Sequence, residues 1–272
     1  MGGIIFIVPT IITIVYLCLS DRVEFTYNLA IVLVVFILYA LLGFLDDFIS
    51  IKRKHNEGLT IAQKFLGQVL IALIFFFIFM KYDGNTNFTV SSLGIDINLG
   101  WGYGIFILLL LVGFSNAVNL TDGLDGLAGG LSAISFVAFA LISLFIGQED
   151  MGIFCFILVG TIAGFLMFNA YPARIFMGDT GSLALGGVLA TIAILTRREI
   201  TLFIICLPFV IETASSMIQI LYYKLTKKRV FLNSPLHHHF EKLGYQEPDI
   251  VKAFWLFGIL CSLAGIYFAV WL

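Results

Sequence analysis

Residues 29–47 read LAIVLVVFILYALLGFLDD, and this stretch decides the fold class. Residues 29–45 contain no charged side chain, and a run of this length crosses the roughly 30 Å hydrocarbon core of a bilayer as one α-helix. The run ends in Asp46-Asp47, two adjacent carboxylates at the point where such a helix would reach water. The stretch therefore predicts a membrane-spanning helix with polar chemistry at one end.

The same apolar pattern recurs along the chain and predicts an all-α polytopic integral membrane protein. Of the 272 residues, 60% are hydrophobic and 12% are charged, whereas a soluble domain has about 25% charged residues. Alternating apolar residues in 85–99 predict a small extracytoplasmic hairpin. We expect one domain, residues 1–272, with about nine transmembrane helices. The predicted spans are 3–19, 29–45, 62–80, 102–118, 127–147, 152–170, 182–196, 200–223 and 252–271.

The 15 Lys and Arg residues divide unevenly between the two predicted sides. Four lie on one side: Arg22, Lys81, Arg197 and Arg198. The other side holds Lys52, Arg53, Lys54, Lys64, Arg174, Lys224, Lys227, Lys228, Arg229, Lys242 and Lys252. The positive-inside rule places this richer side in the cytoplasm, with the N-terminus cytoplasmic and the C-terminus outside. A net charge of −2 indicates no basic surface for nucleic acid.

Four polar clusters fall on the predicted cytoplasmic side. The first is Asp46-Asp47, and the second is a short loop with Asn119, Asp122 and Asp125. The third, residues 169–187, centres on Asp179, and the fourth is the 234–241 run SPLHHHFE. Carboxylates and amides suit Mg²⁺ or Mn²⁺ better than Zn²⁺. The coincidence of the clusters on one side of a nearly uncharged bundle indicates a catalytic site.

Each cluster also has a structural interpretation. Asp46 and Asp47 could terminate a helix, Asp122 and Asp125 could cap the next one, and the glycines around Asp179 could serve close helix packing. The His run could be a solvated surface or a zinc site. Glu212, four residues after Pro208, lies within the eighth predicted span, where an ionisable residue indicates function. Pro208 should bend that helix, and the sequence assigns Glu212 no role.

Five segments closely resemble the bacterial phospho-N-acetylmuramoyl-pentapeptide transferases, within the polyprenyl-phosphate N-acetylhexosamine-1-phosphate transferases. They are GFLDDFISIKRK (43–54), GLTIAQKFLGQ (58–68), SNAVNLTDGLDGLAGG (115–130), FNAYPARIFMGDTGSLALGG (168–187) and SPLHHHFEKLG (234–244). The Asp-Asp and Asn-x-x-Asp-Gly-x-Asp patterns mark the wider family, and the His run resembles the muramoyl-pentapeptide branch. In one respect the chain departs. Family members have ten spans, and a Lys-containing segment precedes their second span. Met1-Gly2-Gly3 resembles the end of that segment. The family's first helix and the Lys-containing segment therefore have no counterpart among these residues, and their roles are not assigned to this chain.

The resemblance implies an enzyme of the bacterial inner membrane with its active site facing the cytoplasm. Its partners would be UDP-MurNAc-pentapeptide and undecaprenyl phosphate, its cofactor Mg²⁺, and its products UMP and the first lipid-linked peptidoglycan precursor. Known members are homodimers. Two alternatives stay open: a sister enzyme that transfers phospho-GlcNAc from UDP-GlcNAc, and an ion-coupled transporter, whose carboxylates would lie near the bilayer midplane.

The resemblance also implies residue roles. Asp179 is the expected metal ligand, and Asp46 and Asp47 lie at the reacting phosphates, with Asp46 as general base or nucleophile. A lipid phosphate is largely ionised near pH 7, so direct attack and a covalent aspartyl intermediate both stay open. His238 is expected to be catalytic. Substrate-binding roles fall to Lys64, Asn119, Asp122, Asp125, Asn169, Phe176, His237 and His239, with Asn169 and Phe176 at the uracil.

Overall fold

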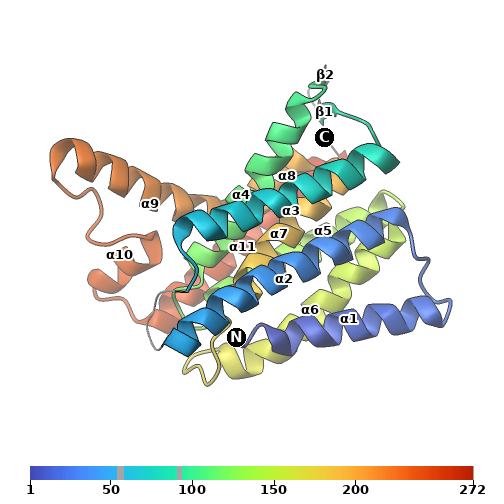
Figure 1. Cartoon of the computed structure of the whole chain (residues 1–272). Helices are drawn as coiled ribbons and strands as arrows, with labels where there is room; N and C mark the ends of the chain where they lie inside the picture. Colours follow the sequence, from blue (N-terminus) through green and yellow to red (C-terminus); the bar gives the residue numbers. More distant parts are fainter. Residues whose placement is uncertain (54–57, 91–93, 272) are drawn as a thin grey trace.

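The computed structural model describes residues 1–53, 58–90 and 94–271, as a bundle of long helices with one small hairpin (Figure 1). Lys54 and residues 91–93 of the predicted hairpin turn lie outside the described residues. The elements are α1 (Ile4–Leu19), α2 (Tyr27–Arg53), α3 (Ile61–Tyr82), β1 (Asn87–Val90), β2 (Ile95–Asn98), α4 (Gly102–Thr121), α5 (Leu127–Phe145), α6 (Glu149–Asn169), α7 (Gly178–Leu195), α8 (Glu199–Ile205), α9 (Leu207–Thr226), α10 (Leu236–Lys242) and α11 (Glu247–Trp271).

The bundle is built to cross a membrane. Among the described residues, seven helices are long and apolar enough to span a bilayer, or eight if α8 and α9 count as one bent span. Large apolar side chains such as Phe77 on α3 and Leu256 on α11 are exposed on its outer surface. In water such a surface would drive aggregation, whereas lipid covers it. The chain is a multi-pass membrane protein.

The predicted count of nine spans is not confirmed. The first predicted span is α1, which has 16 residues and therefore reaches only about 24 Å. The eighth is broken at Cys206 into α8 and α9, whose axes differ by 79°. The predicted bend is confirmed, and Pro208 lies in the first turn of α9, where its missing N–H costs no helical hydrogen bond.

The centre of the bundle is α7, which is buried from Thr180 to Leu195. Glycines let its neighbours approach closely. A Cβ added at Gly186 would lie 2.2 Å from the carbonyl oxygen of Phe114 on α4, and one at Gly187 would lie 2.4 Å from the ring of Tyr39 on α2. Helices α2 and α4 therefore pack closely on α7, which fixes the ends of all three helices relative to one another.

The hairpin is confirmed, and two predicted boundaries are wrong. Strands β1 and β2 pair antiparallel, with Phe88 opposite Ile97. Helix α2 continues to Arg53, so Asp46 and Asp47 lie within the helix and do not terminate it. Asn119 was expected in a loop but lies in the last turn of α4. The helix can continue this far because the Asn119 side chain donates hydrogen bonds to Asp179 and Ser182 on α7.

Candidate active site

Three carboxylates from two helices meet at one end of the bundle. Asp46 and Asp47 project from α2, and Asp179 lies in the first turn of α7. One oxygen from each carboxylate lies within 4.8 Å of the other two. Gly43 permits this approach, since a Cβ there would lie 2.1 Å from the carbonyl oxygen of Asp179. The set is one that could hold a divalent cation.

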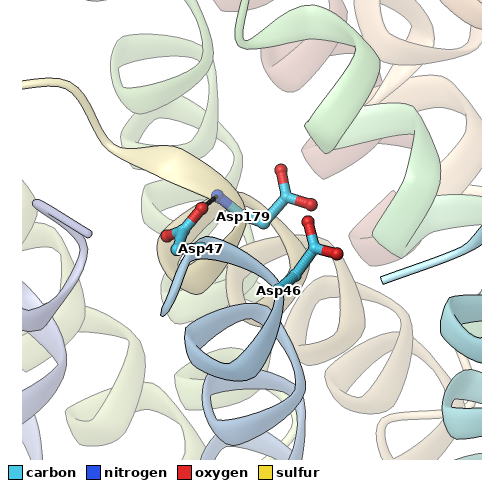
Figure 2. A group of neighbouring side chains, drawn as sticks. All are labelled: Asp46, Asp47 and Asp179. Atoms are coloured by element: carbon cyan, nitrogen blue, oxygen red, sulfur yellow. Dashed lines mark hydrogen bonds between the residues drawn. The ribbon is translucent and has the colours of Figure 1, made fainter. Parts of the chain in front are cut away.

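Asp47 caps α7. Its Oδ1 accepts a hydrogen bond from the backbone N–H of Asp179 at 3.1 Å, and its Oδ2 accepts from the backbone N–H of Thr180 at 3.2 Å and from Thr180 Oγ1 at 2.6 Å. A carboxylate at a helix N-terminus is stabilised by those free N–H groups and by the helix dipole. Figure 2 shows Asp47 directed at this backbone, while the carboxylates of Asp46 and Asp179 face each other.

A lysine and an amide complete the polar end of the bundle. Lys64 Nζ donates to Asp179 and lies 3.8 Å from Asp46 Oδ2, so one cation bridges the two facing carboxylates. On the other side, Asn119 Nδ2 donates to Asp179 Oδ1 at 2.7 Å and to Ser182 Oγ at 2.8 Å. The carboxylate of Asp179 on α7 is therefore held from two other helices, α3 and α4.

A pocket of about 310 Å³ opens beside Asp179. Its lining contains the residues expected at the nucleotide: Asn119, Asp122, Asp125, Asn169, Phe176 and Asp179. Phe176 is 69% exposed and offers a free ring face, whereas Asn169 is 3% exposed. Asn169 Nδ2 donates to the carbonyl oxygen of Ile175 at 2.9 Å, and its Oδ1 is buried without a partner among the described residues.

The loop between α4 and α5 is tied down at Asp125. Its backbone N–H donates to Glu247 Oε1 at 2.6 Å, and its Oδ2 accepts from the backbone N–H of Ala173 at 2.8 Å. Asp122 in the same loop lies among other carboxylates. Burial, and then the negative charge of Asp179, raise the pKa of Asp122 to about 7. Asp122 is therefore poised between its neutral and charged forms near neutral pH.

The fourth polar cluster forms the short helix α10, and its first histidine is buried. His237 and Glu212 are both 0% exposed. Glu212 Oε1 accepts from the backbone N–H of His237 at 3.1 Å, and its Oε2 lies 3.0 Å from His237 Nδ1. The other ring nitrogen, Nε2, lies only 2.3 Å from where a Cβ of Gly123 would be. Glu212 on α9 therefore seats His237 against the rim of the pocket.

The structure does not bring His238 and His239 to the carboxylates. His238 Nδ1 lies 2.5 Å from Glu241 Oε2, and His239 Nδ1 accepts from the backbone N–H of Leu232 at 3.1 Å. Neither residue lines the pocket beside Asp179. The alternative interpretation of the whole run as a solvated surface is wrong, because these residues form a helix and His237 is buried. The expected roles of His238 and His239 stay predictions.

Three contributors to the site were missed by sequence reasoning. Thr180 and Ser182 bond to Asp47 and Asn119, and their place one and three residues after Asp179 could have pointed to them. Glu247 holds the pocket loop from the start of α11. No sequence pattern links it to a loop so distant in the chain.

Comparison with known proteins identifies the family. The family described as glycosyl transferase family 4 matches residues 29–197. Three curated proteins named phospho-N-acetylmuramoyl-pentapeptide-transferase align with the whole chain. The protein from Geobacillus sp. (strain WCH70) is 49% identical to this chain, and the alignment covers 84% of its length. The protein from Bacillus subtilis (strain 168) is 48% identical, with 84% of its length covered. The protein from Anoxybacillus flavithermus is 50% identical, with 83% of its length covered. The chain belongs to the phospho-N-acetylmuramoyl-pentapeptide-transferase family.

The family model and the curated relatives cover different parts of the site. Residues 29–197, matched by glycosyl transferase family 4, include all three clustered carboxylates and the lining of the pocket beside Asp179. The phospho-N-acetylmuramoyl-pentapeptide-transferases also align with the remainder, which contains Glu212, α10 and α11. The carboxylate cluster thus belongs to the part shared with the broader family.

Proposed function

We propose that this chain transfers phospho-MurNAc-pentapeptide from UDP-MurNAc-pentapeptide to undecaprenyl phosphate, with release of UMP. The names of its relatives supply the transferred group. The observation that carries the proposal is the position of Asp179, which belongs both to the carboxylate cluster and to the pocket of about 310 Å³. A reacting phosphate and its nucleotide can therefore occupy adjoining parts of one site.

The residues present fit Mg²⁺, a hard cation that prefers oxygen ligands and is usually bound by one or two carboxylates together with substrate phosphates. We propose Asp179 as the ligand, with Asp46 beside it. Asp47 is fully engaged in capping α7, so we assign it to positioning Asp179. When bound, the cation would neutralise charge on the pyrophosphate and the attacking phosphate.

The pocket lining suits a uracil nucleotide. The exposed ring of Phe176 can stack on the base, and the unpartnered Oδ1 of Asn169 can accept its imide N–H. Lys64, now between two carboxylates, can turn to the pyrophosphate when substrate arrives. We also retain Asn119, Asp122 and Asp125 as pocket residues. His237 remains a phosphate donor in this proposal, since its buried Nε2 has no hydrogen-bond partner among the described residues.

A second pocket suits the chain of the lipid substrate. It has a volume of about 330 Å³ and lies between α4 and α9, with an almost wholly apolar lining that includes Phe106, Gly113, Ala117 and Met217. Phe106 to Ala117 spans about 16 Å of helix. Asn119 follows two residues later, so a polyprenyl chain in this groove would present its phosphate to the carboxylates.

In the proposed reaction, an oxygen of the lipid phosphate forms a bond to the sugar-side phosphorus of the UDP donor, and the bond from that phosphorus to the UMP oxygen breaks. Asp46 faces the reacting phosphates and Lys64 offsets their charge. Direct attack and an aspartyl intermediate on Asp46 remain alternatives. His238 and His239 lie outside the pocket. In this proposal they would contact parts of the donor that are far from the reacting phosphates.

The charge bias favours an active site that faces the cytoplasm. The bacterial inner membrane and the homodimer are implied by the resemblance and stay predictions. Transport is disfavoured, because the three clustered carboxylates gather at one end of the bundle and the buried Glu212 already has a partner in His237. The test is to incubate the purified chain with undecaprenyl phosphate, Mg²⁺ and either UDP-MurNAc-pentapeptide or UDP-GlcNAc, and to measure UMP. We expect release from the first donor alone. Release from UDP-GlcNAc only would replace the proposal with the sister activity.

A further inference from the structure

A third pocket, separate from the nucleotide pocket and the lipid groove, lies where α9 ends. It has a volume of about 280 Å³ and is formed by the last turns of α9 and the loop that leads to α10. Figure 1 shows α9 running outward from the bundle, with α10 returning beneath it. The polar residues that line the pocket are Gln219, Tyr223, Lys224, Arg229, Asn233 and Ser234.

This pocket is cationic. Residues 213–240 contain no Asp or Glu, whereas Lys224, Lys227, Lys228 and Arg229 follow one another closely. Within the described part of the chain, neither Lys224 nor Arg229 has a carboxylate partner. Two unpaired cations facing one hollow favour an anionic ligand, because such a ligand supplies the missing charge.

The loop side of the pocket is ordered by its own hydrogen bonds. Gln219 Oε1 accepts from the backbone N–H groups of Val230 and Phe231 at 3.1 and 2.9 Å, and Arg229 Nη1 donates to the carbonyl oxygen of Leu232 at 3.0 Å. The amide and hydroxyl groups of Asn233 and Ser234 add neutral polar contacts. This combination suits a peptide end, which has both a charge and backbone amides.

The loop that lines this pocket leads directly to His237, beside the proposed donor site. Ser234 is three residues from His237, which packs against Gly123 at the rim of the nucleotide pocket. Along α9, Glu212, the partner of His237, and Lys224 are separated by about 18 Å. Five extended residues span about 17 Å. A pentapeptide whose sugar lies near His237 can therefore place its far end in this pocket.

We propose that the pocket formed by Gln219, Lys224, Arg229 and Ser234 binds the carboxylate end of the donor's pentapeptide. In a muramoyl peptide the N-terminus is attached to the sugar, so the free α-carboxylate is at the far end. The pocket then selects donors by peptide length and charge, away from the reacting phosphates. This assignment rests on the proposed function.

The test compares two donors in the purified full chain: UDP-MurNAc-pentapeptide with a free C-terminal carboxylate, and the same donor with a C-terminal carboxamide. Initial rates of UMP release give KM and kcat for wild type, for the double variant Lys224→Gln/Arg229→Gln, and for Lys228→Gln. Lys228 is a matched control, since it is exposed and does not line the pocket.

For the carboxylate donor, the double variant should raise KM about tenfold with kcat unchanged, which corresponds to about 1.4 kcal/mol. Wild type with the carboxamide donor should show the same rise, and the two changes should not add, because both remove one interaction. Lys228→Gln should match wild type.

Equal KM values for the two donors in wild type would overturn the assignment, as would a KM rise of the same size for both donors in the double variant. An effect of the double variant that appears only in vesicles rich in anionic phospholipid would also overturn it and assign the pocket to a lipid headgroup. Failure of wild type to use either peptide donor, with activity on UDP-GlcNAc, would reject the proposed function and the subsite together.

Discussion

Asp46 and Asp47 are neighbours in sequence, but the structure gives their carboxylates different surroundings. Asp47 accepts three hydrogen bonds from the start of α7, whereas Asp46 accepts one from the backbone N–H of Leu59 at 2.6 Å and faces Asp179 and Lys64. The carboxylate of Asp47 therefore holds the start of α7 in place, whereas the carboxylate of Asp46 is directed into the site.

This difference predicts opposite consequences for the two amide variants. Asp47→Asn should lower the free energy of unfolding by about 1–2 kcal/mol, as loss of a helix cap does, because one amide oxygen cannot accept three donors. Asp46→Asn should leave stability unchanged but lose most of its UMP release, since the group facing the reacting phosphates is altered. Thermal unfolding in detergent and the UMP assay measure the two effects. Equal destabilisation by both changes would contradict the assignment.

The raised pKa of Asp122 predicts a pH dependence of donor binding without metal. Asp122 is neutral below pH about 7 and anionic above it. A UDP-sugar has a pyrophosphate that stays doubly charged across this range, so affinity should fall as pH rises from 6 to 8. A new like charge in the pocket that holds the pyrophosphate should lower the affinity about tenfold or more. Titration calorimetry in chelator should show this fall in wild type and a flatter profile in Asp122→Asn. An identical profile in the two proteins would remove Asp122 as the cause.

At the scale of the helices, one substitution tests whether the groove between α4 and α9 binds the polyprenyl chain. A Cβ at Gly113 meets nothing within 4 Å, and Gly113 lines the groove. Gly113→Leu should therefore fill the groove without straining the protein and raise KM for undecaprenyl phosphate several-fold, with KM for the donor unchanged.

Gly160 on α6 provides the control. A Cβ there also meets nothing within 4 Å, but the residue does not line the groove. Gly160→Leu should leave both KM values unchanged. If the two leucine variants behave alike, the groove is not where the polyprenyl chain lies.

The helices show how far sequence reasoning reaches. Long apolar runs such as the one in α2 were predicted, because lipid requires continuous helices with satisfied backbone groups. The 79° break before α9 was anticipated only as a bend at Pro208, since a proline does not specify how neighbouring helices redirect the chain. Helix α10 was missed because its order depends on Glu212, a partner 25 residues earlier in the sequence.

The site was predictable where the residues share short motifs. Asp46, Asp47, Asp179 and the pocket residues were named from motifs, and the structure brings them together. Glu247 and the cationic pocket at the end of α9 were not predicted. Both depend on segments that meet only after the bundle has packed.

For the whole molecule, the charge bias predicts which face is cytoplasmic. Lys52 near the end of α2 and Ser20 after α1 are both exposed and lie on opposite predicted sides. In a Cys18→Ala background, Lys52→Cys should react with an impermeant thiol reagent only in inverted vesicles, and Ser20→Cys only in intact cells. The other three cysteines are buried and should not react with the reagent. The reverse pattern would place the active site outside.

The central claim is that the carboxylates of α2 and α7 form a cation-dependent phosphotransfer site beside the nucleotide pocket. Carboxylates about 5 Å apart repel each other by roughly 3 kcal/mol at an effective dielectric near 20, and a pyrophosphate adds further repulsion. Lys64 alone does not offset this charge, so transfer between the two phosphates should require a divalent cation at Asp179.

The most direct test measures UMP release from UDP-MurNAc-pentapeptide and undecaprenyl phosphate with Mg²⁺, with chelator, and in Asp179→Asn. Release should be lost in chelator and restored by added Mg²⁺, and Asp179→Asn should fold normally and lose most turnover at every Mg²⁺ concentration. Full release in chelator, or full release by Asp179→Asn, would contradict the account.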